Sequence, residues 1–120
     1  KSLRTLTYKL FSTLNNNLPN YVTYQNGFAD VTEHDRSYYF KIGKIVTVVV
    51  NAIGDVSTST TIIFNLPAGY RPISNVKTNY TRDGYAMSGT LTADIAGNIR
   101  VHNTTAYNGS VCGLLTFLTA

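Results

Sequence analysis

Turn-forming residues interrupt this chain so often that only short regular elements are expected between them. From Tyr21 onward, Gly, Asn and Asp stand at the ends of short runs rich in Val, Ile, Thr and Tyr. The clearest pair of runs is 90–95 and 98–102, which alternate between apolar and polar residues around Gly97. About eight such strands, roughly eight to twelve residues apart, predict an all-β domain with an antiparallel β-sandwich or jelly-roll fold.

Four turns are predicted from their residues. Gly43 is expected to join the strands 38–42 and 44–51, and Asp83-Gly84 to form a second turn. Gly54-Asp55 is expected to end a strand, and Asn108-Gly109 to precede the last strand, 111–118. In the hairpin around Gly97, we expect these side chains to face inward: Leu91, Ala93, Ile95, Ile99 and Val101. Facing water we expect Thr92, Asp94, Arg100 and His102.

Two strands carry apolar residues on both faces. The run 45–50 is apolar except for Thr47, and in the last strand Cys112, Leu114 and Leu118 share the face opposite Val111, Leu115 and Phe117. A sandwich strand needs only one apolar face. Either the second face is buried in an oligomer, or the N-terminal segment covers it.

The first twenty residues differ from the remainder, so we divide the chain into a segment 1–20 and a β-sandwich head domain 21–120. Leucines at positions 3, 6, 10 and 14 would align on one helical face, although the threonines between them favour a strand almost as well. We interpret residues 1–20 as the stub of a stalk or neck, or as a packed lead-in. The start lacks both an initiator Met and an apolar signal region, which indicates a piece of a longer chain.

Composition argues against several classes of protein. One cysteine, Cys112, permits neither an internal disulfide nor a multi-cysteine zinc site. No apolar run approaches the ~20 residues of a membrane span, so no membrane insertion is expected. The net charge of +4 is spread without adjacent basic residues, which argues against a nucleic-acid partner.

Residues suited to catalysis are scattered along the chain. His34 adjoins Asp35 in the polar loop 32–36, His102 lies on the outward side of a hairpin, and Cys112 lies in an apolar strand, where we expect a small core residue. The six carboxylates fall in different turns, and those at positions 30, 33 and 35 lack the glycine-containing loop of a calcium site. We therefore expect no enzyme, no metal and no cofactor.

Binding residues are easier to find. A saccharide site needs an aromatic face for the sugar, and a chain with nine Tyr and no Trp must supply it from Tyr. One turn region combines Asn79, Tyr80, Arg82, Asp83 and Tyr85. A second candidate loop, 104–108, contains Tyr107, and a third contains His34, Asp35 and Arg36. The alternative is that Tyr80 and Tyr85 only pack the ends of the sandwich.

Three stretches resemble a known family: residues 39–48, residues 61–72 and residues 96–101. A hairpin with Ile-Val-Thr-Val, a Leu-Pro-Ala-Gly-Tyr-Arg-Pro loop and a Gly-Asn hairpin follow one another here. This order is similar to that in the C-terminal domain of bacteriophage tail-fibre and baseplate receptor-binding proteins. The resemblance covers about residues 25–118, and the loop 66–72, which we expect to be a framework corner, is its most specific part.

The resemblance implies a homotrimeric head at the tip of a phage tail, on the outside of the virion. Such a head attaches to a saccharide or a protein of the bacterial surface, and its stalk joins the other tail and baseplate proteins. Two alternatives stay open, a purely structural trimerisation cap and a saccharide-degrading tip domain.

Overall fold

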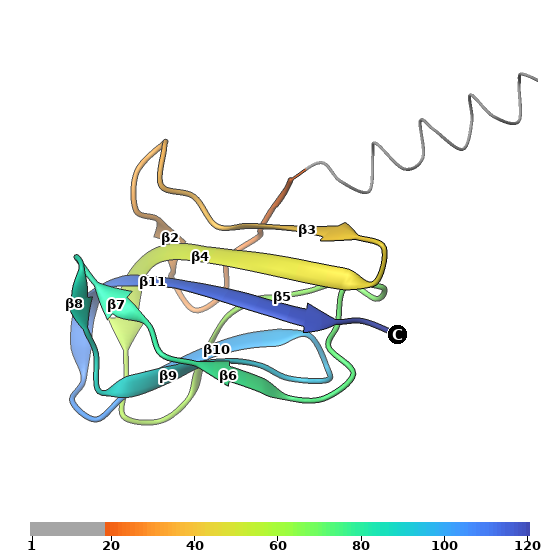
Figure 1. Cartoon of the computed structure of the whole chain (residues 1–120). Helices are drawn as coiled ribbons and strands as arrows, with labels where there is room; N and C mark the ends of the chain where they lie inside the picture. The colour runs from red at the N-terminus through yellow and green to blue at the C-terminus, as the bar shows by residue number, and fades with distance from the viewer. Residues whose placement is uncertain (1–18) are drawn as a thin grey trace, which may run out of the picture.

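The computed structural model describes residues 19–120, so the leucine pattern of the first segment lies outside the described chain. The described part contains eleven strands and no helix, and hence no helix long and apolar enough to cross a membrane. The strands form two antiparallel sheets that pack against each other (Figure 1). The prediction of an all-β antiparallel fold is confirmed.

The strands are short except for two. In chain order they are β1 Asn20–Tyr21, β2 Ala29–Asp30, β3 Tyr38–Ile42, β4 Ile45–Val56, β5 Thr61–Asn65, β6 Val76–Thr78, β7 Thr81–Arg82, β8 Tyr85–Ala86, β9 Gly89–Ala93, β10 Asn98–Asn103 and β11 Tyr107–Leu118. The larger sheet has the order β1-β3-β4-β11-β7-β8, with β2 also paired to β4. The smaller sheet has the order β5-β10-β9-β6.

The long strands β4 and β11 form the centre of the larger sheet. They pair along all twelve residues of each, from Ile45 opposite Leu118 to Val56 opposite Tyr107. Alternate side chains of both strands point into the core, which therefore lies between the two sheets. The smaller sheet supplies the side chains that were predicted to face inward and are fully buried: Leu91, Ala93, Ile99 and Val101.

Two glycines that were predicted to mark turns lie inside these long strands. Gly54 of β4 and Gly109 of β11 are directly opposite each other. A Cβ on Gly54 would lie 2.7 Å from Cδ1 of Phe28, and a Cβ on Gly109 would lie 2.7 Å from Nε of Arg82. Glycine is needed here because another side chain occupies the space of a Cβ. Both predictions of a strand boundary were therefore wrong.

The hairpin between β9 and β10 turns earlier than the sequence predicted. The carbonyl of Asp94 accepts a hydrogen bond from Gly97 N at 2.8 Å, and its carboxylate accepts bonds from Ala96 N and Asn98 N at 3.0 Å each. Because an Asp side chain can satisfy the backbone donors of a turn, the turn starts at this residue. Ile95 is consequently in the turn and 63% exposed, so the prediction that it faces inward was wrong.

Two other turns lie where they were predicted. Gly43 has φ +62° between β3 and β4, and Asp83 and Gly84 have φ +49° and +84° between β7 and β8. Glycine adopts this left-handed backbone without steric cost, and Asp tolerates it better than most residues.

The loop 66–72 has the contacts of a framework corner. Arg71 donates from Nε to the carbonyl of Leu66 at 2.9 Å, and the Tyr70 ring packs edge-on against Tyr39 with 5.0 Å between ring centres. Pro72 forms a bridge to the end of the chain next to β11. The loop thus connects β5 to β6 of the smaller sheet and packs against β3 and the end of β11 at one end of the sandwich.

Candidate functional site

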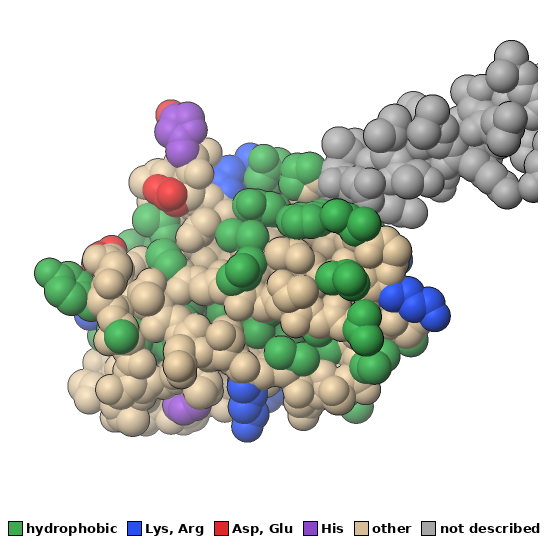
Figure 2. Space-filling view, in the orientation of Figure 1, with side chains coloured by type: hydrophobic (Ala, Val, Ile, Leu, Met, Phe, Trp, Pro, Cys, Tyr) green, Lys and Arg blue, Asp and Glu red, His purple; other side chains and the backbone are tan. Residues whose placement is uncertain are grey.

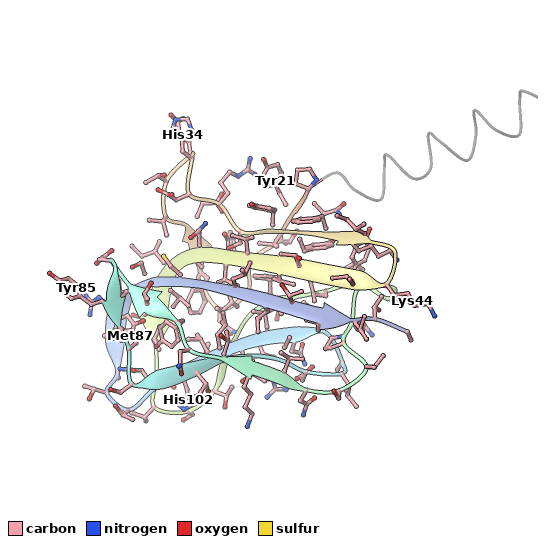
Figure 3. The ribbon with its side chains drawn as sticks, in the orientation of Figure 1. Tyr21, His34, Lys44, Tyr85, Met87 and His102 are labelled. Atoms are coloured by element: carbon pink, nitrogen blue, oxygen red, sulfur yellow. The ribbon has the colours of Figure 1, made fainter. Side chains whose placement is uncertain are left out.

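The predicted binding residues lie in two separate regions. The hairpin end comprises residues 79–85 of the β7–β8 hairpin and residues 107–110 at the start of β11. The β2–β3 loop comprises residues 31–37. Figure 3 shows Tyr85 projecting from the first region and His34 from the tip of the second.

Arg82 and Asp83 attach the hairpin to β11. The Arg82 guanidinium carbon lies 4.5 Å from the centre of the Tyr107 ring, and Nη2 donates to the carbonyl of Asn108 at 3.3 Å. The Ser110 hydroxyl donates to Asp83 at 2.9 Å. The two loops predicted from the sequence are therefore in contact, and their charged side chains are engaged by the protein's own groups.

Tyr80 is only 2% exposed. Its hydroxyl donates to the carbonyl of His102 at 3.3 Å and lies 3.3 Å from the hydroxyl of Tyr107. Burial raises the pKa of Tyr80, and burial together with the bond to Tyr80 raises the pKa of Tyr107, so both remain neutral phenols. The ring of Tyr80 therefore packs within the sandwich and presents almost no surface.

Three predicted residues of the hairpin end are exposed, and one of them, Asp83, is held by the Ser110 hydroxyl. Tyr85 is 77% exposed, and Asn79 is exposed just before β7. Tyr85 and Asn79 offer one exposed aromatic ring and one exposed amide to a ligand.

Asp35 shapes the β2–β3 loop from within. Its carboxylate accepts a bond from the Thr32 hydroxyl at 2.9 Å, and its backbone N–H donates to the same hydroxyl at 3.0 Å. His34 is carried at the exposed tip, with Nε2 3.3 Å from the carboxylate of Glu33. Asp35 thus stabilises the turn through its bonds to Thr32, and the exposed His34 side chain is accessible to solvent or to a ligand.

Arg36 is the fixed member of this loop. Its guanidinium carbon lies 3.6 Å from the centre of the Tyr21 ring, and its Nε donates to Asp30 at 3.3 Å. The other carboxylate oxygen of Asp30 accepts a 2.5 Å bond from the Tyr24 hydroxyl. Burial and this bond to Asp30 raise the pKa of Tyr24 to about 12. Since the cation lies over a ring and its carboxylate partner is anchored, Arg36 has a defined position.

A hollow of about 330 Å³ opens between the β2–β3 loop and the outer face of the larger sheet. Two of the three predicted loop residues, His34 and Arg36, line it, whereas Asp35 does not. The residues that complete the lining were not predicted: Tyr21, Glu33, Tyr38, Val49 and Asn51. They come from four separate segments, and only the tyrosines carried a signal in the sequence, as sugar-binding aromatics.

The hollow combines groups suited to a hydroxyl-rich ligand. The Tyr21 and Tyr38 rings meet edge-on with 6.4 Å between centres, and Tyr38 stacks on Phe40 at 6.4 Å. Arg36 and His34 add donors beside these rings. Rings accept the C–H face of a sugar, while planar polar groups bind its hydroxyls. Within residues 19–120 no three His, Cys, Asp or Glu side chains gather in a way that could hold a metal ion.

An apolar surface adjoins the hollow. On the outer face of the larger sheet the register places Ile45 beside Leu118 and Val49 beside Leu114. Leu114 is 57% exposed, and Figure 2 shows hydrophobic side chains gathered over β3, β4 and β11. We call this surface the outer apolar face, with these members: Tyr38, Phe40, Ile42, Ile45, Val49, Leu114 and Leu118. Cys112 is also on this face and only half-buried, so it is not a core residue as expected.

Comparison with known proteins identifies the fold. No family model and no curated protein matches the chain. The head domain of the lactococcal phage bIL170 is similar with a TM-score of 0.67 and 14% identity, over 87% of this chain and 99% of that one. The receptor-binding protein (gp15) of Listeria phage PSA is similar with a TM-score of 0.57 and 19% identity, over 98% of this chain and 74% of that one. The chain therefore has the fold of the head domains of phage receptor-binding proteins.

Proposed function

We propose that this chain is the head domain of a phage receptor-binding protein and that it attaches the tail to a saccharide of the bacterial surface without cleaving it. The observation that carries the proposal is the likeness in fold to the bIL170 head domain along 99% of that domain. The second similar structure is also a phage receptor-binding protein. The family resemblance of the loop 66–72 points the same way and favours a position at the tail tip, on a tail fibre or baseplate.

The hollow at the β2–β3 loop is the primary contact site in this proposal. It presents the rings of Tyr21 and Tyr38 next to the donors of Arg36 and His34. Asp30 already neutralises Arg36, so the site suits a ligand rich in hydroxyls. The exposed Tyr85 and Asn79 at the hairpin end form a second, weaker contact surface.

Copies of the chain associate through the outer apolar face in the same proposal, as a homotrimer. An exposed face of Ile and Leu on a head with only 13% charged residues suits burial against a second copy. Tyr38 and Val49 belong both to this face and to the lining of the hollow. A neighbouring copy would therefore border the ligand site.

The proposal is tested by binding of the 120-residue chain to a bacterial glycan array. We expect the double variant Tyr21→Ala/His34→Ala to lose about tenfold in apparent affinity, because each removes a group that lines the hollow and about 1.4 kcal/mol corresponds to a factor of ten. Tyr85→Ala reports separately on the hairpin end. Lys44→Ala is the matched control, since Lys44 is exposed at the opposite end of the molecule (Figure 3).

Two results would contradict the proposal. A wild-type chain that binds no glycan and no bacterial cell would favour the structural trimerisation cap. Release of reducing sugar from bacterial wall material would favour the saccharide-degrading alternative. Thermal unfolding of each variant shows whether a loss of binding reflects a loss of fold.

A further inference from the structure

The outer face of the smaller sheet carries a polar cleft that is separate from the proposed site. The cleft measures about 360 Å³. Charged and hydroxyl-bearing or imidazole side chains make up most of its lining: Lys77, Thr90, Thr92, Asp94, Arg100 and His102. Figure 3 shows His102 on this face, on the side of the molecule away from His34.

The strand register places two cations on either side of a hydroxyl. Lys77 of β6 is opposite Thr92 of β9, and Thr92 is opposite Arg100 of β10. Since neighbouring strands are about 4.8 Å apart, the backbones at Lys77 and Arg100 are about 10 Å apart with Thr92 between them. Thr92 and Arg100 alternate with buried residues, and the exposed Lys77 is directly opposite Thr92, so all three share the outer face.

The carboxylate in the cleft is already satisfied by the protein. Asp94 accepts bonds from the backbone of Ala96 and Asn98, from the Asn98 amide, and from Arg100 Nε at 2.9 Å. Burial alone would raise the pKa of Asp94, but the bonds from Asn98 and the charge of Arg100 outweigh it and hold the pKa below its usual value. The negative charge of Asp94 is therefore committed to the turn and to Arg100.

The groups left over in the cleft are mainly donors. The Lys77 ammonium and the terminal nitrogens of Arg100 have no hydrogen-bond or ion-pair partner within residues 19–120. His102, which we expected to be solvated, lies half-buried with Nδ1 3.0 Å from the Thr90 hydroxyl, which leaves its Nε2 free. A cleft with two cations and spare N–H groups is complementary to a ligand rich in acceptor oxygens.

We propose that this cleft binds an oxyanion, a carboxylate or a phosphate, carried by an acidic saccharide. The oxyanion lies over Thr92 between Lys77 and Arg100, and Nε2 of His102 binds a neighbouring hydroxyl. No Tyr or Phe lines the cleft, so the ligand is recognised through its polar groups rather than by stacking on a phenyl or phenol ring. The inference that an oxyanion binds depends on the cleft alone. The inference that a saccharide carries this oxyanion depends on the proposed function.

The test titrates the 120-residue chain with glucose 1-phosphate, glucuronic acid and glucose, and follows the backbone amides of Lys77, Thr92 and Arg100 by NMR. We expect saturable shifts of these amides with one or both acidic ligands and none with glucose. The acidic ligand that binds more tightly identifies the anion. Lys77→Gln is expected to weaken binding about tenfold, Lys77→Arg to retain most of it, and Lys44→Gln to leave it unchanged.

Equal shifts with glucose, or unchanged binding by Lys77→Gln, would overturn the proposal. Saturable binding of inorganic phosphate with no gain for glucose 1-phosphate would overturn its saccharide part. The glycan-array variants Tyr21→Ala/His34→Ala do not touch this cleft, and Lys77→Gln does not touch the hollow. A negative result for anion binding at the cleft can therefore be told apart from a negative result for the proposed function.

Discussion

The tyrosines of residues 19–120 show how one residue type is divided between the core and the surface. Tyr80 is buried, and the hydroxyl of Tyr107 lies beside it and within 3.0 Å of the Ser110 carbonyl. Tyr21 and Tyr85 are exposed, at 53% and 77%. A phenol can pack or bind a ligand equally well, so its tertiary neighbours decide which it does.

Glycines 54 and 109 permit a prediction at the scale of single residues. Gly54→Ala should lower the free energy of unfolding by about 1–3 kcal/mol, because the new Cβ meets the buried Phe28 ring. Gly109→Ala should lower the free energy of unfolding by less, because its new Cβ meets the side chain of Arg82, which can move away. Urea unfolding followed by circular dichroism measures both changes.

The two variants control for each other, since both add one methyl group to the same cross-strand pair. If both variants lost the same free energy of unfolding, strand propensity, and not the close approach of Phe28, would explain the glycine at position 54.

At the scale of elements, the β9–β10 hairpin depends on one carboxylate. Asp94 closes the turn through backbone bonds and pairs with Arg100 of β10. The same residue thereby displaces Ile95 from the core into the turn. A charged side chain can thus set where a hairpin turns, even where alternation of apolar residues continues past it.

Asp94→Asn should destabilise the chain by roughly 1 kcal/mol at pH 7, since the amide keeps an acceptor oxygen but loses the charge that pairs with Arg100. The folded-state pKa of Asp94 is below its ordinary value. Its ionisation therefore stabilises the fold above the unfolded pKa of about 3.9, and this contribution is lost as the pH falls through the folded pKa.

The measurement is urea unfolding of both proteins between pH 2.5 and 8. We expect the difference in free energy of unfolding between the wild-type chain and Asp94→Asn to be constant above about pH 5 and to shrink below about pH 4. If this difference stayed constant down to the lowest pH, the charge of Asp94 would not contribute to the stability of the fold.

At the scale of the whole molecule, the two outer faces of the sandwich differ in kind. The outer apolar face of the larger sheet exposes Ile45, Leu114 and Leu118, each by more than half. The outer face of the smaller sheet carries the charged and hydroxyl side chains of the cleft, including Lys77 and Arg100. This asymmetry suits a head that buries one face against its copies and leaves the other to solvent and ligands.

Leu114→Asp tests this asymmetry, because it places a charge where the proposed interface is apolar. We expect the wild-type chain to have a mass of about 40 kDa in solution, three times 13.2 kDa, and the variant to have the mass of one copy. Light scattering coupled to size exclusion measures the mass, and circular dichroism reports the fold.

Thr104→Asp is the matched control, since Thr104 is exposed in the loop between β10 and β11. A wild-type chain that is monomeric at all concentrations would contradict the proposed trimer.

The sequence by itself determined the features that arise between near neighbours in the chain. Alternation predicted the all-β class and the inward faces of β9 and β10, and turn residues predicted the backbone at Gly43 and Gly84. Both signals are local, because side-chain alternation and positive φ depend only on adjacent residues.

Only the tertiary structure decided which distant segments meet. Gly54 and Gly109 have turn chemistry in the sequence, but Phe28 and Arg82 pack over them and keep them in strands. The hollow likewise joins Tyr21 to the β2–β3 loop and to the outer side of β4, and no local pattern connects these positions. The reason is physical: close approach of side chains far apart in the chain depends on the packing of both sheets.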